Sequence, residues 1–320
     1  MAGTGVFAEP TFETLLQHPG LVVGLFTQPD RDAGHERGST RQTGKGMKAI
    51  AQAHGLPVFQ PASINTPEGE AMLRELRPDL LVVAAYGQIL KSFILAVPPL
   101  GCINVHAALL PKYRGAAPIN WAIYHGETIT GVTIFRLSTG VDTGDILAQE
   151  STPIGPDETA GDVEARLAVL GAQLAERVVL QMRDGTAPVG TKQDNALATR
   201  APKLTKEHGA IDWSRPADRV CCQVRAMQPW PTAYTYWHRP GQPPLRLIVC
   251  RARPAPPPVA PLAPGQIVAE RHDALLVGAG DGTLVEVVEL QPAGKRRMSA
   301  VDFLRGRRPQ PGDRLGPEHA

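Results

Sequence analysis

The sequence lacks a long apolar run, since no stretch approaches the roughly 18 to 20 residues that a membrane-spanning helix needs. Its opening residues, MAGTGVFAEPTFE, also lack the basic patch followed by an apolar stretch that marks a secretory signal. These two absences argue against an integral membrane protein and against a secreted one. With 42% hydrophobic and 20% charged residues, the composition is that of an ordinary globular protein.

Cysteine is scarce, and its placement excludes two kinds of site. The four cysteines contain no C-x-x-C pair, and the neighbours Cys221 and Cys222 are poorly placed for a disulfide with each other. No Cys/His spacing fits a zinc site, so we expect no bound metal. Free or buried thiols are typical of the reducing cytoplasm, where we expect the protein to work.

Net charge is low, but it is the sum of two parts of opposite sign. Residues 1–200 carry 16 Lys/Arg and 20 Asp/Glu, a balance of −4, and residues 201–320 carry 17 and 11, a balance of +6. A basic second part suits a polyanionic partner such as a nucleic acid. A solvated surface with scattered arginines fits the charge equally well.

The first part of the chain, residues 1–185, alternates between apolar β-rich runs and helical stretches. The clearest run is DLLVVAAYG at 79–87, as expected for a strand covered on both faces. The alternation predicts βαβ units with right-handed crossovers, and hence a Rossmann-like, doubly wound α/β domain. We expect strands at 21–29, 55–61, 79–87, 102–111 and 130–137, and helices at 8–17, 45–54, 67–76, 117–125 and 158–184.

The second part has a different pattern. Residues 186–208 resemble an extended basic connector, and residues 209–320 contain short strands with tight turns and one short helix at 219–227. The last predicted strand includes SAVDFL, at 299–304. This pattern predicts a small OB-like β-barrel, a fold that often binds oligonucleotides.

The start of the chain contains a turn without its strand. Ala2-Gly3-Thr4-Gly5 resembles a glycine-rich turn that opens a helix, and such a turn normally follows a strand. Only Met1 precedes it. We therefore expect the first strand to be missing, which would expose the edges of its apolar neighbours, and we expect the natural start to lie upstream.

The most informative stretch is GCINVHAALLPKYRGAAPINWAI, at 101–123. Asn104 and His106 are two residues apart on a predicted strand, so they share one face at its carboxyl end, where open α/β sheets bind ligands. Asp142, in GVDTGDI, follows another predicted strand and can approach the same edge. An amide and an imidazole can stabilise the oxyanion of acyl transfer to an amine, and a carboxylate can accept a proton through water. A structural histidine and a turn-capping aspartate remain the alternative.

These motifs, I-N-V-H-x-x-L-L-P-x-Y-R-G-A-A-P-I, G-V-T-I and D-T-G, resemble those of the folate-dependent formyltransferases. The resemblance is strongest to the members that act on methionyl initiator tRNA, because IDWS, RAMQPWPTAYT, LQPAGKRRM and PGDRL match in the second half. It implies transfer of a formyl group from 10-formyltetrahydrofolate to the α-amine of methionyl initiator tRNA, for translation initiation, by a monomer without a metal. A formyltransferase for a small amine and a non-catalytic RNA-binding protein remain the rivals.

The resemblance also implies which residues form the site. Asn104, His106 and Asp142 fall on the catalytic triad of the family. Ala108 stands where the family usually has a serine, so one hydroxyl contact is lost. The implied folate-binding residues are Ala108, Leu109, Leu110 and Pro111, together with Tyr86 and Gly87.

For the tRNA, the resemblance implies a basic loop at about 31–47 that enters the acceptor stem. Several cations there would neutralise phosphates and make binding sensitive to salt. The implied tRNA-binding residues are Arg37, Arg41 and Lys45 of this loop, with Lys203 and Lys206 of the connector extending the basic track.

Overall fold

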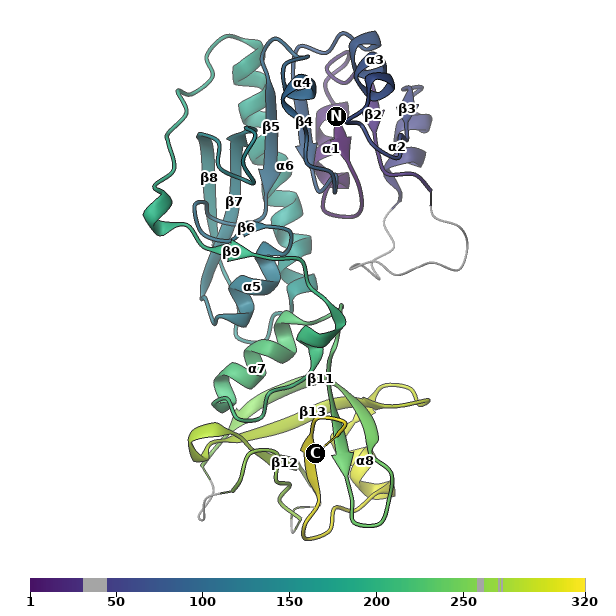
Figure 1. Ribbon diagram of the computed structural model, residues 1–320, viewed down its shortest axis with the longest axis vertical. Helices are drawn as coiled ribbons and strands as arrows, with labels where there is room; N and C mark the ends of the chain where they lie inside the picture. Colours follow the sequence, from purple (N-terminus) through teal and green to yellow (C-terminus); the bar gives the residue numbers. More distant parts are fainter. Residues whose placement is uncertain (31–44, 258–261, 270, 272, 320) are drawn as a thin grey trace. The chain divides into compact units, whose positions relative to one another are not determined.

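The structure is a computed structural model that describes residues 1–30, 45–257, 262–269, 271 and 273–319 (Figure 1). They form two compact units. The first comprises Met1–Ile119, Ile129–Ile154 and Gly161–Lys203, and the second comprises Asn120–Thr128, Gly155–Ala160 and Leu204–Ala320. Among the described residues, no helix has both the length and the apolar character needed to cross a membrane.

The first unit is built on a seven-stranded sheet with the order β3-β2-β1-β4-β5-β7-β8. The strands from β3 to β5 pair in parallel, and β7 and β8 are antiparallel. This confirms the predicted Rossmann-like α/β class. The strands are β1 Ala2–Gly3, β2 Leu25–Phe26, β3 Val58–Phe59, β4 Leu81–Ala84, β5 Cys102–His106, β7 Ile129–Arg136 and β8 Ile146–Pro153, and the helices are α1 Glu9–Leu16, α2 Met47–Ala53, α3 Pro67–Glu75, α4 Ser92–Leu95 and α6 Ala160–Arg183. Helix α5, Pro118–Tyr124, belongs mostly to the second unit.

The expectation of a missing first strand is corrected, because the first two residues of the glycine-rich segment, Ala2–Gly3, themselves form a strand, β1. β1 lies between β2 and β4, and Ala2 pairs with both Phe26 and Val83. The Met1 carbonyl accepts a hydrogen bond from the Phe26 amide at 2.8 Å. The edges of β2 and β4 are therefore covered. β1 was missed because only Met1 precedes it, whereas the equally short β2 lies in the apolar run LVVGLF.

The sheet has two different faces at β5. A Cβ on Gly171 of α6 would lie 2.9 Å from a methyl group of Val105, so α6 packs directly on the face to which Val105 points. Side chains alternate along a strand. Cys102, Asn104 and His106 therefore lie on the other face of the sheet, away from α6, which runs alongside β5 (Figure 1).

The connector is more ordered than the sequence suggested. Its residues 190–201, here called the strap, pack along the first unit. Thr191 pairs with Ile146, and β9 (Arg200–Ala201) pairs in parallel with β6 (Arg114–Gly115). Between them lies a short 3₁₀ turn, η1 (Asn195–Leu197). The strap thus runs past the loop that follows β5.

The second unit is a barrel-like antiparallel sheet with the order β12-β13-β11-β10-β15, and β14 pairs with β13. Gln266 bridges to Arg314 of β15 and Ile267 bridges to Val277 of β12, so this segment links the two edge strands and nearly closes the barrel. The predicted OB-like class is confirmed. The elements are β10 Ala233–His238, β11 Leu245–Ala255, β12 Leu275–Gly278, β13 Leu284–Pro292, β14 Met298–Ser299, β15 Arg314–Gly316, α7 Ala217–Ala226, α8 Ala300–Gly306, η2 Lys206–Gly209 and η3 Gly280–Gly282.

The predicted last strand at 299–304 is wrong, because these residues begin helix α8. The Ser299 side chain accepts a hydrogen bond from the Asp302 amide at 3.1 Å and caps the helix. Ala300, Phe303 and Leu304 are buried, which is helical spacing. The Phe303 ring packs against Trp237, with centroids 5.2 Å apart.

Candidate active site

His106 lies at the carboxyl end of β5 and is almost completely buried, with 5% of its surface exposed. Its Nε2 is 3.0 Å from the Tyr113 carbonyl. Since a carbonyl only accepts hydrogen bonds, Nε2 must carry a hydrogen. Nδ1 is therefore the nitrogen that gains or loses a proton, and it lies 3.7 Å from Oδ2 of Asp142.

The surroundings of His106 act on its pKa in opposite directions. Burial lowers the pKa of His106 below its usual value, and this is the largest effect. The Asp142 carboxylate and the hydrogen bond to Tyr113 both raise it. The imidazole is thus neutral in the resting site, and a carboxylate stands ready to stabilise a proton on Nδ1.

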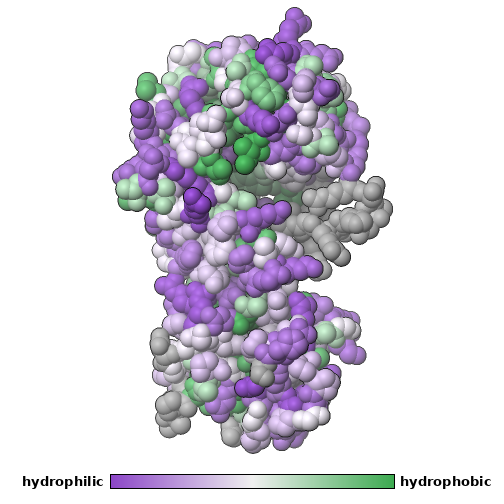
Figure 2. All heavy atoms as spheres, viewed as in Figure 1, coloured by the Kyte–Doolittle hydropathy of each residue, from purple (hydrophilic) through white to green (hydrophobic). Residues whose placement is uncertain are grey.

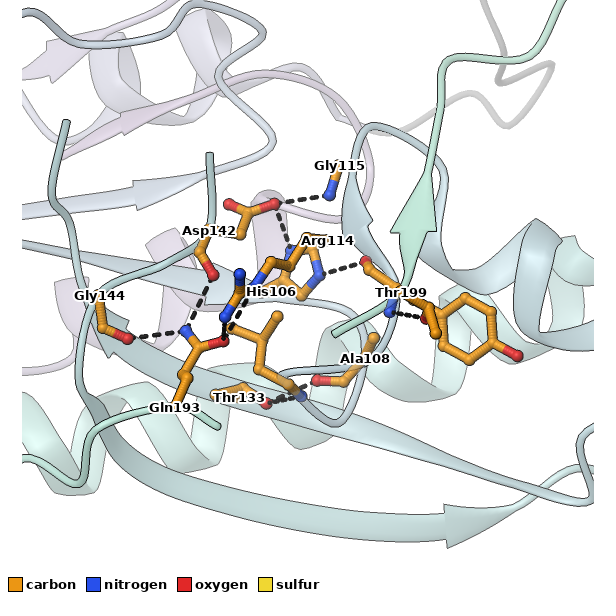
Figure 3. A network of polar contacts seen from close by, with 11 residues as sticks. His106, Ala108, Arg114, Gly115, Thr133, Asp142, Gly144, Gln193 and Thr199 are labelled. Atoms are coloured by element: carbon orange, nitrogen blue, oxygen red, sulfur yellow. Dashed lines mark hydrogen bonds and ion pairs between the residues drawn. The ribbon is translucent and has the colours of Figure 1, made fainter. Parts of the chain in front are cut away.

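Asp142 is held by its side chain and by its backbone. Its Oδ2 accepts a hydrogen bond from the Gly115 amide at 2.8 Å. Its backbone adopts a left-handed conformation, with φ of 52°, which residues other than glycine rarely adopt. The Gln193 amide donates to the Asp142 carbonyl at 2.9 Å and to the Gly144 carbonyl at 2.7 Å (Figure 3). These contacts fix the carboxylate beside His106.

The loop after β5 is anchored by Thr133, which lies opposite His106 on β7. Its hydroxyl donates to the Ala108 carbonyl at 2.6 Å and accepts from the Leu110 amide at 3.1 Å. Gln149 donates to that hydroxyl at 2.9 Å and to the Leu110 carbonyl at 2.8 Å. The hydroxyl therefore makes all three hydrogen bonds open to it.

The structure brings two of the predicted catalytic residues, His106 and Asp142, into a direct pair. Asn104 lies on the same face of β5, two residues from His106, and is half-buried. Within the part of the chain that the structure describes, the side-chain amide of Asn104 makes no hydrogen bond. That amide is available to a substrate oxygen.

The predicted folate-binding residues lie on two neighbouring loops. β4 and β5 are adjacent and parallel, so residues 85–90 and 107–111 leave the same edge of the sheet. Ala108 and Leu110 are buried, and Leu109 and Pro111 are half-buried. A Cβ on Gly131 would lie 2.6 Å from Leu109, so that leucine packs directly over the glycine.

The other loop presents a buried tyrosine next to exposed residues. Tyr86 is 1% exposed, its hydroxyl has no partner among the described residues, and burial raises the pKa of Tyr86 to about 12. Its carbonyl accepts a hydrogen bond from Gln28 at 2.9 Å. Gly87 is exposed, and Ile89 is 69% exposed. Hydrophobic side chains gather on this face of the first unit near β4 and β5 (Figure 2).

The predicted tRNA-binding residues are only partly described. Arg37 and Arg41 lie outside the described residues. Lys45 forms an ion pair with Glu13 at 2.7 Å, which raises the pKa of Lys45. Lys203 and Lys206 are exposed. Across the ranges that the structure describes, no three His, Cys, Asp or Glu side chains group as a metal site requires.

Cys102 shares the face of Asn104 and is no candidate nucleophile. Burial raises the pKa of Cys102 to about 12, so its thiol stays protonated near neutral pH. A thiol acts as a nucleophile through its thiolate. The site thus contains an amide, an imidazole and a carboxylate, the groups suited to non-covalent acyl transfer.

Sequence reasoning missed the residues that support this site, namely Arg114, Thr133, Gln149, Gln193 and Thr199. One of them carried a signal, because Thr133 is a polar residue in a predicted buried strand. Gln193 carried none, since its partner Asp142 lies 51 positions away in the chain.

Comparison with known proteins agrees with the geometry. The family model described as formyl transferase matches residues 1–179, and the model of the formyl transferase C-terminal domain matches residues 203–308. A methionyl-tRNA formyltransferase from Citrifermentans bemidjiense is 45% identical over 318 residues, 99% of this chain and 96% of that protein. Another from Symbiobacterium thermophilum is 45% identical over 319 residues, 99% of this chain and 95% of that protein.

A solved structure shares the fold. The Helicobacter canadensis N-formyltransferase, in complex with folinic acid and dTDP-3-aminofucose, superposes with a TM-score of 0.66 at 17% identity. The match covers 89% of this chain and 97% of that one. From the two family models and the full-length relatives together, the chain belongs to the formyl transferase family.

Proposed function

We propose that this formyl transferase moves the formyl group of 10-formyltetrahydrofolate to the α-amino group of methionyl initiator tRNA, in the cytoplasm, for translation initiation. The observation that carries the proposal is the similarity over 99% of the chain to proteins named methionyl-tRNA formyltransferase, the second unit included. The pairing of His106 with Asp142 supplies the chemistry.

The attacking amine needs little activation. A free α-amino group has a pKa of roughly 7.7–8.0, so a large share is neutral near pH 7 to 8. Its nitrogen attacks the formyl carbon, a new C–N bond forms, and the formyl oxygen gains negative charge. The site must mainly stabilise that oxyanion. We assign the Asn104 side-chain amide to it, joined by Nδ1 of His106 once that nitrogen has taken up a proton.

The protons that move during the reaction are taken up and returned by Asp142 and His106. The attacking nitrogen becomes positively charged and passes its proton, through water, to the Asp142–His106 pair. When the tetrahedral intermediate collapses, the bond from the formyl carbon to the folate nitrogen breaks. That nitrogen leaves with a proton from the same pair, so the resting site is restored. The buried position of His106 keeps these charges out of bulk water.

The two loops at the edge of the sheet suit the donor. A pterin is flat and largely apolar on its faces, and Leu109 and the exposed Ile89 offer apolar contact. We assign folate binding to Tyr86, Gly87, Ala108, Leu109, Leu110 and Pro111. Ala108 adds no hydroxyl, and its carbonyl is taken by Thr133, so the loop would bind through shape and its remaining backbone groups.

The test is a formylation assay with several acceptors. The protein is incubated with 10-formyltetrahydrofolate and, separately, methionyl initiator tRNA, methionyl elongator tRNA, glycinamide ribonucleotide or a nucleotide-linked amino sugar, and N-formyl products are measured by mass spectrometry. We expect product with methionyl initiator tRNA and none without the folate. Formylation of a small amine in preference to the tRNA would contradict the proposal.

A further inference from the structure

We propose that Gln193 is a positioning residue for the formyl transfer. From the strap, it sets the position of Asp142 beside Nδ1 of His106. This inference rests on the proposed function of the site and assigns to it a residue that acts through Asp142.

The Gln193 amide uses both ends to join two loops (Figure 3). Its Nε2 donates to the carbonyls of Asp142 and Gly144, at 2.9 and 2.7 Å. Its Oε1 accepts from Nε and Nη2 of Arg114, at 3.0 and 2.7 Å. Both amide hydrogens and the oxygen are therefore engaged in one well-defined orientation.

The two loops are the ones that hold the Asp142 carboxylate. Arg114 directly precedes Gly115, whose amide donates to Oδ2 of Asp142 at 2.8 Å. Gln193 thus fixes the backbone of Asp142 through its nitrogen and the backbone that binds the carboxylate through its oxygen. Asn195, two residues on, accepts from Arg114 at 3.0 Å and completes this connection.

The same strap supports the other partner of His106. Thr199 accepts a hydrogen bond from the Tyr113 amide at 2.8 Å, and its carbonyl accepts from the Arg114 amide at 2.9 Å. Tyr113 is the residue whose carbonyl holds Nε2 of His106. One segment therefore fixes the groups on both sides of the imidazole.

Loss of Gln193 should release Asp142. The left-handed backbone of Asp142 is strained, so it persists because surrounding contacts hold it. Without the two bonds from Gln193, the loop can relax and the carboxylate can move away from Nδ1. The carboxylate raises the pKa of His106, so its departure should lower that pKa further.

The test uses Gln193→Met, which keeps the length of the side chain, and Gln193→Ala. We expect kcat for formylation to fall about 10- to 100-fold, because a small misplacement of a catalytic group has an effect of that order. KM for the tRNA and the temperature of unfolding should stay close to those of the wild type. The matched control is Val189→Ala, on the adjoining residues before the strap, where the side chain is 95% exposed.

A second measurement follows His106 itself, without turnover. Histidine residues are labelled with carbon-13 and titrated by NMR, and the signal of His106 is assigned by its loss in His106→Gln. The midpoint of that signal should move to lower pH in both Gln193 variants and stay in place in Val189→Ala. A residue with a purely structural role would not shift this midpoint.

The outcomes separate the two proposals. If the wild type formylates no tRNA, the proposed function fails, and the NMR titration still tests the position of Asp142. If the wild type is active and the Gln193 variants keep its kcat or leave the His106 midpoint unmoved, the positioning role is overturned. A lower kcat together with a lower midpoint supports it.

Discussion

His106 is held at one nitrogen and is able to titrate at the other. The Tyr113 carbonyl fixes Nε2 and the orientation of the ring, and Nδ1 faces the Asp142 carboxylate at 3.7 Å. This division gives each group of the pair a single task. The separation exceeds a direct hydrogen bond, so the carboxylate acts on the imidazole through its charge.

Thr133 is the residue on which the loop after β5 depends, and its replacement is a direct test. Thr133→Val keeps the shape of the side chain but leaves the Ala108 carbonyl and the Leu110 amide without their partner. The free energy of unfolding should fall by about 1–3 kcal/mol, the usual cost of leaving a buried polar group unsatisfied. Urea unfolding measures this, and Thr133→Ser, which keeps the hydroxyl, is the control. A Thr133→Val protein as stable as the wild type would show that the loop does not need these bonds.

The sequence predicted the placement of the candidate catalytic residues better than it predicted the residues that hold them in place. The spacing of Asn104 and His106 placed them on one face of a strand, because side chains alternate along strands, and the structure agrees. That Asp142 lies close to His106 was a hypothesis, because their proximity depends on how the strands are arranged in the fold. Gln193 and Thr199 were beyond prediction, since no local pattern marks a side chain whose partners are distant in the sequence.

The strap is the element whose side chains hydrogen-bond to the loops on both sides of His106. Its pairing with β6 is tight, because a Cβ on Gly115 would lie 2.5 Å from the Ala201 carbonyl, and Gly115 has φ of 127°. Only glycine fits this conformation and this approach.

Gly115→Ala should therefore separate β6 from β9. We expect the free energy of unfolding to fall by roughly 1–3 kcal/mol, the cost of such backbone strain, and kcat to fall because the Gly115 amide holds Asp142. Chemical denaturation and steady-state kinetics measure the two effects. Gly306→Ala, where an added Cβ meets no atom within 4 Å, should lower neither quantity. Unaltered stability and kcat in Gly115→Ala would refute the importance of the strap.

Prediction of the elements depended on their length. Long elements such as α6 and β7 were found because their periodicity is sustained, with α6 running over 24 residues. β1 escaped because no apolar run surrounds it, unlike the two-residue strands β2 and β3, and β9 escaped because its short parallel pairing with β6 has no local signature. α8 was mistaken for a strand because β-branched and aromatic residues favour strands, while its capping serine was overlooked.

The whole molecule joins an acidic part to a basic one, and this division makes a prediction about salt. Residues 1–200 carry −4 and residues 201–320 carry +6. Release of counterions from neutralised phosphates should make the logarithm of tRNA affinity fall linearly with that of salt, with a slope of about −0.7 to −0.9 per phosphate. Filter binding between about 50 and 200 mM salt measures the slope.

Substitution of the exposed lysines of the connector tests this prediction. Lys203→Ala combined with Lys206→Ala should weaken the slope by roughly 1 to 2, according to the number of phosphates that these lysines neutralise. Lys91→Ala, an exposed lysine of the acidic part, is the control and should change nothing. Affinity that does not depend on salt would exclude an electrostatic contribution of this size.

The family was predictable from whole-chain motifs, and both family models confirm it. The fold was predictable as well, because in each half of the chain the family motifs and the pattern of strands and helices indicated the same architecture. What could not be predicted is how residues 186–208 are used. They resemble a basic connector in the sequence, but Gln193 and Thr199 among them hydrogen-bond to Asp142 and to Tyr113, beside the residues proposed as catalytic.

The most direct test of the central claim is single-turnover formylation of methionyl initiator tRNA by the wild type, by His106→Ala and by Asp142→Asn, with both substrates saturating. We predict that the wild type forms N-formylmethionyl-tRNA and that each variant is slower by about 10²- to 10⁴-fold, the usual contribution of general acid–base catalysis. The dissociation constant for the tRNA should stay within about threefold, because neither side chain is assigned to tRNA binding. Turnover by either variant at the wild-type rate would contradict the assignment of the site.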